Sequence, residues 1–331
     1  MENQIKLFYS KDWVDYELLD TGEGEKLEKF GKYIFVRPYE DAVWEKTLSK
    51  KEWEQADGKF WSSKVGAKAG WKMENKNLQG KTLQKWEMKY RGIKFLVLPT
   101  PFRHLGFFPE QASHWDFIET KIKEATTQKT VFGETSLKTV FKPKFLNLFG
   151  YTGVASLFAL RAGAEVTHLD ASKQTLNWAK ENEKLNSSQF AQGQSLRVIE
   201  DDVLKFLERE EKRGNKYDAI IMDPPKFGRG PKGEVWKLEE MLPKLLSAVR
   251  KVLSDKPLFV IITSYAVDSS SLSLGYALEY MMKDFPKDGL LGKAGGDFEG
   301  KVETGELCVL EKSNNRIIPL ANTAVWGALE K

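Results

Sequence analysis

The chain has 331 residues, of which 41% are apolar and 30% are charged. This length fits two domains, and the composition excludes a disordered protein. The one cysteine, Cys308, excludes an internal disulfide, and the lack of a signal-peptide core or a membrane-spanning apolar stretch predicts a cytoplasmic protein.

Residues 1–100 carry short β-type runs and no helical periodicity. The clearest runs are residues 33–36, 86–90 and 93–98, which breaks containing Gly and Asp separate. We therefore predict a smaller, β-rich N-terminal domain over residues 1–100.

The net charge of +4 is unevenly distributed. Residues 59–94 hold ten Lys or Arg and only two acids, with Trp61, Trp71, Trp86 and Tyr90 among them. Cations between aromatic rings are typical of surfaces that neutralise phosphates and stack on bases. A solvated β surface with its aromatic rings turned inward explains the same residues, so both interpretations are kept.

Residues 101–140 are expected to connect the two domains. Pro99 and Pro101 mark a corner, and a helix is predicted from Pro109 because the apolar residues that follow recur at helical spacing. The polar residues 126–138 fit either a plain connection or a short paired strand.

Strands and helices alternate from residue 141 to residue 331. Strands are expected at 145–149, 165–169, 197–200, 217–222 and 258–262, with helices at 154–162, 173–185, 203–211 and 238–253 between them, and a final hairpin at 305–311 and 316–325. This alternation predicts an α/β fold with a doubly wound, mostly parallel sheet.

One strand runs directly into the sequence Asp223-Pro224-Pro225-Lys226-Phe227. Two consecutive prolines make a stiff corner, and open α/β sheets bind ligands at the carboxyl ends of their strands. The corner therefore presents Asp223 and nearby carbonyl oxygens as acceptors beside an aromatic ring, an arrangement that suits a planar group bearing an amine. A proline-terminated strand without chemistry is the alternative.

Three further positions follow strand ends. Glycines at 150 and 153 open a helix, where they let the backbone approach a ligand. Asp170 ends the next strand, from which a carboxylate reaches ribose hydroxyls. Asp202 follows the third strand and fits either an adenine amine or the N-cap of the next helix.

These motifs together resemble the class I S-adenosylmethionine-dependent methyltransferases, and especially the bacterial ribosomal-RNA methyltransferases that share DPPKF. The resemblance covers residues 102–331 and implies a seven-stranded Rossmann-like sheet, an S-adenosyl-L-methionine cofactor and an RNA substrate. A nicotinamide dehydrogenase would more naturally carry G-x-G-x-x-G, and residues 149–153 lack that spacing.

The resemblance also implies roles for individual residues. Asp223 would lie beside the sulfonium methyl, Asp170 would hold the ribose and Asp202 the adenine. The residues implied in cofactor binding are Gln111, Asn147, Phe149, Gly150, Tyr151, Gly153, Asp170, Ala171, Asp202 and Asp223, and those implied in catalysis are Asp223, Pro224, Lys226 and Phe227. No metal is expected, because His104, His114 and His168 lack ligand spacing.

The accepting atom is narrowed by a missing cysteine. Relatives that methylate carbon-5 of cytosine carry a nucleophilic cysteine after the strand that follows DPPKF, where this chain has Tyr265. A nitrogen acceptor, with Phe227 stacked on the base, is therefore favoured. The basic loop 226–233 is either a lid, a phosphate clamp or a solvated loop, and residues 234–236 fit the start of the next helix.

Two other functions are consistent with the sequence. In the first, the chain is a methyltransferase whose substrate is a protein or a small molecule. In the second, the chain binds RNA without catalysis and keeps the cofactor only for stability. The sequence does not specify an oligomeric state.

Overall fold

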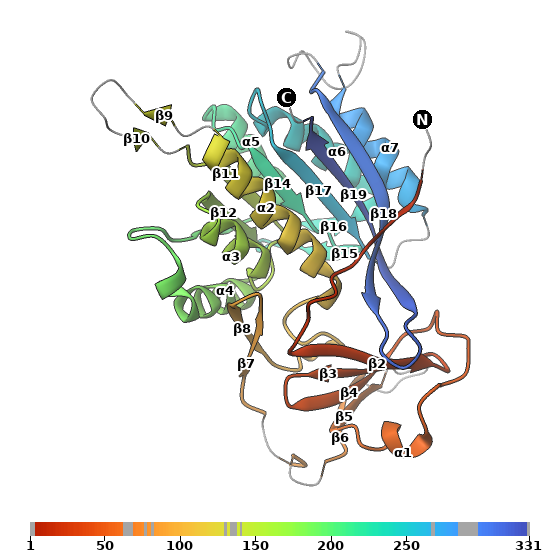
Figure 1. The fold of residues 1–331 in the computed structure, drawn as a ribbon. Helices are drawn as coiled ribbons and strands as arrows, with labels where there is room; N and C mark the ends of the chain where they lie inside the picture. Colours follow the sequence, from red (N-terminus) through yellow and green to blue (C-terminus); the bar gives the residue numbers. More distant parts are fainter. Residues whose placement is uncertain are drawn as a thin grey trace. The chain divides into compact units, whose positions relative to one another are not determined.

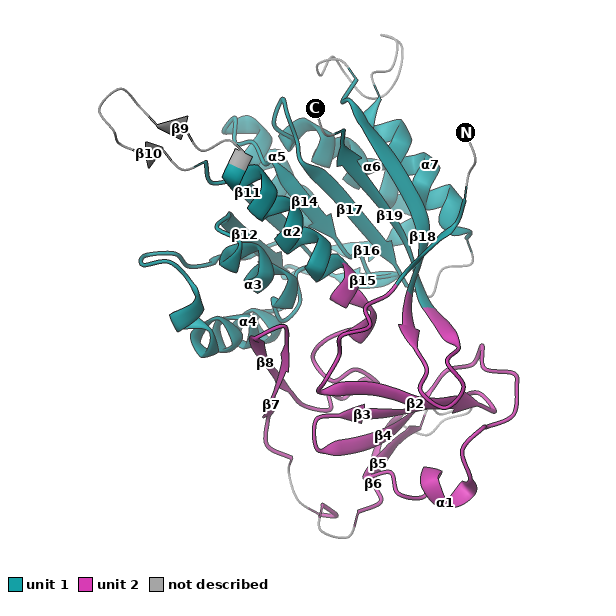
Figure 2. Ribbon diagram, viewed as in Figure 1, with its two compact units in different colours: residues 1–8, 114–307, 320–331 teal, residues 9–113, 308–319 magenta. Residues whose placement is uncertain are grey.

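The computed structural model describes residues 4–61, 69–75, 78–80, 83–128, 131–132, 138–139, 141–265, 269–283 and 297–329. The chain divides into two compact units (Figure 2). The large unit comprises residues 1–8, 114–307 and 320–331, and the small unit comprises residues 9–113 and 308–319.

An eight-stranded sheet forms the centre of the large unit. Its spatial order is β1 (Lys6–Phe8), β18 (Gly300–Leu310), β19 (Ile317–Ala328), β17 (Phe259–Ser264), β14 (Ala219–Met222), β11 (Lys144–Leu148), β12 (Glu165–Asp170) and β13 (Arg197–Glu200). The strands from β17 to β13 are parallel, and β19 pairs antiparallel with β17. The predicted doubly wound α/β fold is confirmed, with β1 as an eighth strand that the sequence did not predict.

Helices cover both faces of this sheet (Figure 1). One face carries α2 (Ala112–Gln128), α3 (Val154–Arg161) and α4 (Lys173–Leu185), and the other carries α5 (Val203–Lys212), α6 (Leu238–Val252) and α7 (Ser271–Met282). Side chains cap three of these helices: Ser172 for α4, Asp202 for α5 and Ser270 for α7.

The strands alternate between the two layers of helices. Phe145 of β11 faces Phe259 and the α2 side, whereas Leu146 and Leu148 pack into the core beneath α5, α6 and α7. Because each central strand is buried on both faces, its sequence is almost continuously apolar. This rigid centre fixes where each strand ends, and therefore where the polar residues after the strands lie.

The small unit contains a five-stranded sheet and a separate hairpin. The sheet consists of β2 (Tyr16–Gly22), β3 (Glu25–Phe30), β4 (Tyr33–Pro38), β5 (Gly58–Trp61) and β6 (Gly70–Met73), and the hairpin of β7 (Trp86–Tyr90) and β8 (Ile93–Val97). A short helix, α1 (Lys50–Trp53), precedes β5. The predicted β-rich N-terminal part of the chain is confirmed.

The segment from Pro109 becomes helical as predicted, first as a short 3-10 turn, η1 (Pro109–Gln111), and then as α2. Two-residue strands β9 (Val131–Phe132) and β10 (Lys138–Thr139) pair antiparallel, so the paired-strand alternative for residues 126–138 is correct. Residues 129–130 and 133–137 lie outside the described residues.

Candidate active site

The glycine turn, residues 149–153, joins β11 to α3 at the carboxyl edge of the sheet. Three of its residues adopt left-handed backbone angles: Phe149 with φ 59°, Tyr151 with φ 53° and Gly153 with φ 85°. Phe and Tyr rarely adopt this conformation, so the surrounding structure must hold it. The Gly150 N–H donates to the Leu169 carbonyl, with 2.8 Å between N and O.

A buried histidine forms the floor of the glycine turn. A Cβ at Gly150 would overlap the imidazole ring of His168, so only glycine fits there. Asn147 Nδ2 donates to Ser156 Oγ at 2.9 Å, and Ser156 Oγ lies 3.0 Å from His168 Nδ1. Burial lowers the pKa of His168 to about 4, although the negative charge of Asp170 acts to raise it. The ring is therefore neutral at physiological pH. Asn147 and His168 therefore support the turn from the core.

Asp170 organises the turn from the side. Its Oδ2 accepts from the Tyr151 N–H at 2.9 Å, and its Oδ1 accepts from the Ser172 N–H at 2.9 Å and from Thr175 Oγ1 at 3.0 Å. The half-buried Ala171 links this strand end to the cap of α4. A carboxylate has about four acceptor positions, so these three bonds leave Asp170 able to accept from a ribose hydroxyl as well.

Asp202 caps helix α5. Its Oδ1 accepts from the Lys205 N–H at 3.0 Å, which confirms the capping interpretation. Among the described residues no donor reaches Oδ2, so capping leaves one oxygen available. The adenine role of Asp202 stays a prediction.

The proline corner, residues 223–227, leaves the sheet at the end of β14 beside the glycine turn. The Asp223 N–H donates to the Leu148 carbonyl, 3.4 Å away, and Leu148 immediately precedes the turn. Asp223 is half-buried and Pro224 is buried, whereas Lys226 is exposed and Phe227 is 57% exposed. A ring this exposed is available for stacking.

The basic loop after the corner is a hairpin. Strands β15 (Phe227–Arg229) and β16 (Val235–Lys237) pair antiparallel, so residues 235–237 are strand and α6 begins only at Leu238. The expectation of a loop over 226–233 is therefore wrong for its first residues, because cross-strand bonds order them. We call this element the β15–β16 hairpin.

Trp236 is a site residue that the sequence did not single out. Its indole Nε1 donates to the Pro225 carbonyl at 2.7 Å, and its ring makes an edge contact with Phe149, 5.0 Å between centroids. A tryptophan between Gly/Pro-rich residues and a helix was the available signal, but nothing local indicated its partners.

Gln111 belongs to the small unit, where it ends η1 and is buried. Its predicted place at the cofactor stays a prediction.

The basic segment 59–94 is less suited to stacking than its composition implies. Trp86 and Tyr90 are buried, Trp71 donates its indole N–H to the Thr100 carbonyl at 2.8 Å, and Trp61 is 40% exposed. Several cations are paired with carboxylates: Lys59 with Glu25, Lys72 with Glu74, Arg91 with Asp12 and Lys94 with Glu87. Lys64, Lys68, Lys76 and Lys81 lie outside the described residues. The inward orientation is thus correct for Trp86 and Tyr90.

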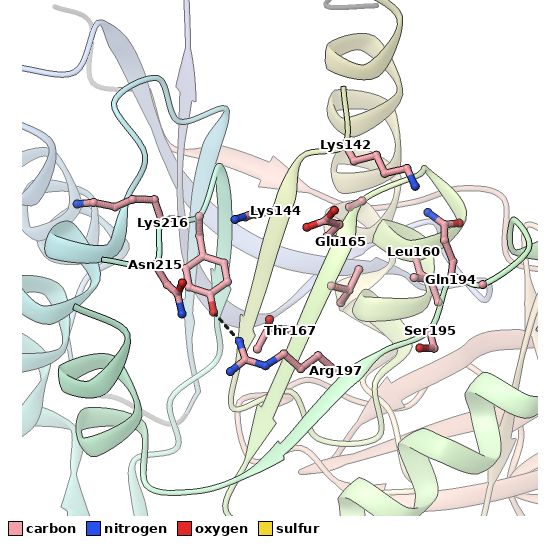
Figure 3. Close-up of a pocket in the computed structure, with 14 residues that line it drawn as sticks. Lys142, Lys144, Leu160, Glu165, Thr167, Gln194, Ser195, Arg197, Asn215 and Lys216 are labelled. Atoms are coloured by element: carbon pink, nitrogen blue, oxygen red, sulfur yellow. Dashed lines mark hydrogen bonds between the residues drawn. The ribbon is translucent and has the colours of Figure 1, made fainter. Parts of the chain in front are cut away.

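A cavity of about 380 Å³ lies at the opposite, amino edge of the sheet (Figure 3). Lys144 and Glu165, from the starts of β11 and β12, line it together with Arg197. The Arg197 guanidinium lies 3.4 Å from the Glu210 carboxylate, which offsets its charge. The polar residues that follow the strands lie at the carboxyl edge, so this cavity is not part of the candidate site.

Within the described ranges, no cluster of three or more His, Cys, Asp or Glu side chains is arranged to hold a metal ion. The same part of the chain has no helix with the length and hydropathy to cross a bilayer.

Comparison with known proteins gives a consistent result. A family model described as S-adenosylmethionine-dependent methyltransferase matches residues 134–263. The crystal structure of a SAM-dependent methyltransferase from Agrobacterium tumefaciens is 35% identical, with a TM-score of 0.82, and the match covers 98% of this chain and 94% of that one.

Curated relatives match over shorter stretches. The Ribosomal RNA large subunit methyltransferase I of Aeromonas salmonicida is 34% identical over 137 residues, which are 41% of this chain and 29% of that protein. The protein of the same name from Klebsiella pneumoniae is 40% identical over 85 residues, 25% of this chain and 20% of its own length. The matches therefore span less than a third of these curated relatives.

Proposed function

Because the chain belongs to the S-adenosylmethionine-dependent methyltransferases, we propose that it methylates a nucleobase of structured RNA in the cytoplasm. Ribosomal RNA is the substrate that we favour, and an amino nitrogen is the acceptor that we favour. Residues 1–100 would dock the RNA, 101–140 would lie over the cofactor, and 141–331 would bind the cofactor and carry out catalysis.

The order of polar groups along the carboxyl edge carries this proposal. Asp202 follows β13, Asp170 ends β12, the glycine turn follows β11 and Asp223 follows β14, and these are four neighbouring strands. At about 4.8 Å per strand the row spans roughly 14 Å, enough for an adenine, a ribose and an amino-acid tail in succession. The acceptor oxygens of Asp170 and Asp202 suit the hydroxyl and amine donors of such a ligand.

The bound cofactor supplies an activated methyl group on a sulfonium. The protein then has to align the acceptor with this methyl and exclude water, and good alignment alone contributes on the order of 7–11 kcal/mol. Asp223 and the carbonyls held by the two prolines accept hydrogen bonds from the amino group of the base. The lone pair of that amino nitrogen then attacks the methyl group. The exposed ring of Phe227 stacks on the base and fixes its plane.

The RNA substrate is supported by the names of the curated relatives, which are ribosomal RNA large subunit methyltransferases. Lys226, Arg229 and Lys232 on and beside the β15–β16 hairpin add positive charge next to the corner. The small unit is a weaker argument, because several of its cations already pair with acids.

A nitrogen acceptor is supported by the cysteine content. Methylation of carbon-5 of cytosine requires a cysteine that adds to the ring. The single cysteine, Cys308, is buried within β18, and Tyr265 follows β17 where that nucleophile is expected.

Methyl transfer from labelled S-adenosylmethionine to ribosomal RNA tests the proposal. We expect incorporation that ribonuclease removes and that Asp223→Ala abolishes, while S-adenosylhomocysteine still binds the variant. Incorporation into protein or small molecules that ribonuclease does not affect would favour a methyltransferase with a protein or small-molecule substrate. RNA binding without turnover under any condition would favour a non-catalytic RNA-binding protein.

Nucleoside mass spectrometry identifies the accepting atom. Ribosomal RNA from a strain that lacks the gene is compared with that of its parent, and one methylated nucleoside is expected to disappear. Loss of 5-methylcytidine would contradict the nitrogen acceptor while leaving the RNA substrate intact.

A further inference from the structure

We infer that Trp236 is a positioning residue that couples the glycine turn to the proline corner, so that cofactor binding sets the position of the acceptor base. The inference rests on the proposed methyl transfer and adds a mechanical link between its two halves. Three observations on the large unit support it.

The first observation is the hydrogen bond to the corner. Trp236 Nε1 donates to the Pro225 carbonyl at 2.7 Å, and Trp236 itself is only 6% exposed. Pro225 has no N–H and a fixed φ, so its carbonyl direction is the main remaining freedom of this peptide. The indole therefore fixes the carbonyl one residue before Lys226 and two residues before Phe227, the predicted base-stacking ring.

The second observation is the contact with the turn. The Trp236 ring meets the Phe149 ring edge to face, with 5.0 Å between centroids and 62° between planes. Phe149 is the first residue of the glycine turn and has a left-handed φ of 59°. This conformation is unfavourable for a bulky residue such as Phe149. Because packing against the Trp236 ring stabilises it, that ring also determines where the turn lies.

The third observation is that the β15–β16 hairpin is attached at both ends of the site. Near the corner, the Leu238 N–H donates to the Lys226 carbonyl at 3.0 Å. At the far end, Glu234 forms an ion pair with Lys205, three residues after the predicted adenine ligand Asp202. The hairpin therefore links the predicted adenine end of the site to the predicted methyl end, with Trp236 as its buried anchor.

These contacts separate two roles of one side chain. The indole N–H holds the corner, and the ring transmits the position of the turn. Trp236→Phe keeps an aromatic ring and removes the N–H, whereas Trp236→Leu removes both. Trp326→Phe is the matched control, because Trp326 is also buried in this core but lies in β19 and packs on Phe298.

Amide hydrogen exchange of residues 226–238, measured with and without saturating S-adenosylhomocysteine, reads the coupling without any RNA. We expect the ligand to slow exchange in the wild type, in Trp236→Phe and in Trp326→Phe, but not in Trp236→Leu. Turnover on RNA is the second readout. A displaced acceptor lowers kcat by about tenfold or more in Trp236→Phe, with S-adenosylhomocysteine affinity within about twofold, and Trp326→Phe keeps the wild-type kcat.

The inference is overturned if the ligand does not slow exchange in the wild type, or if it slows exchange equally in Trp236→Leu. It is also overturned if Trp236→Phe turns over at the wild-type rate. If circular dichroism shows that Trp236→Leu does not fold, the inference is tested by the kcat of Trp236→Phe and by the effect of the ligand on amide exchange in the wild type. A wild type that methylates no RNA but shows the expected exchange pattern would remove the proposed function and leave the coupling standing.

Discussion

The glycine turn and the proline corner lie at neighbouring strand ends, yet they are held in different ways. The turn is supported from inside, by the buried chain from Asn147 through Ser156 to His168 and by the Asp170 carboxylate. The corner is stiff through its two prolines and continues into a hairpin whose side chains are largely exposed. This difference fits the proposed function, in which the turn binds the small cofactor and the exposed corner meets the RNA.

The largest expected effect breaks the turn. Gly150→Ala places a Cβ against the His168 ring and shifts the backbone, and such overpacking typically costs about 1–3 kcal/mol. We expect the affinity for S-adenosylhomocysteine, measured by calorimetry, to fall by up to about 100-fold.

Gly327→Ala is the matched control for that change, because nothing lies within 4 Å of a Cβ at Gly327. Adding His168→Ala to Gly150→Ala makes room for the methyl group and should recover part of the affinity. An unchanged affinity in Gly150→Ala would show that the turn is not the cofactor site.

An intermediate effect is expected at the corner. Phe227→Ala removes a stacking face that is worth about 1–3 kcal/mol per base, so KM for RNA should rise by about tenfold with an unchanged affinity for S-adenosylhomocysteine. Val235→Ala on the paired strand is the control, since Val235 is 48% exposed and offers no ring. If Phe227→Ala weakened S-adenosylhomocysteine binding instead, the proposal that the turn binds the cofactor and the corner binds the base would be wrong.

The smallest effect concerns pH. Burial lowers the pKa of His168 to about 4, whereas an unfolded histidine titrates near 6.5. As the pH falls from about 6.5 towards 4, the unfolded chain takes up a proton that the folded chain does not, so stability falls, whereas above 6.5 this histidine has no effect.

His168→Gln should therefore flatten the fall in urea stability between pH 7.5 and pH 5, by on the order of 1–2 kcal/mol. His104 and His114, whose pKa values burial lowers to about 3, keep their own contributions in the variant. Equal slopes in both proteins would mean that His168 is not buried as a neutral group.

The strand–helix alternation of residues 141–265 could be predicted because the central strands are almost continuously apolar, and because capping residues, Ser172 and Asp202, precede helices α4 and α5. The positions of Asp170 and Asp223 followed from the same alternation. The burial of Trp86 and Tyr90 was also readable, since β7 alternates inward and outward residues.

Other features depend on distant partners. Strand β1 has three residues and exists through its pairing with β18, about 300 positions later. The β15–β16 hairpin is rich in Gly and charged residues, and its order comes from the cross-strand pairing and from the hydrogen bond of Trp236 to the Pro225 carbonyl. Asp202 was compatible with two roles because a cap and a ligand require the same carboxylate at the same strand end.

The division of the chain limits how this protein can be dissected. The backbone passes between the units four times, after residues 8, 113, 307 and 319. A fragment starting at residue 114 would lose the edge strand β1, and residues 308–319 would lose the Thr21 hydroxyl that donates to Glu311. Because Glu311 is fully buried, that truncation would strip a partner from a core carboxylate. An experiment that exchanges the small unit with that of another protein would have to exchange residues 308–319 together with residues 9–113.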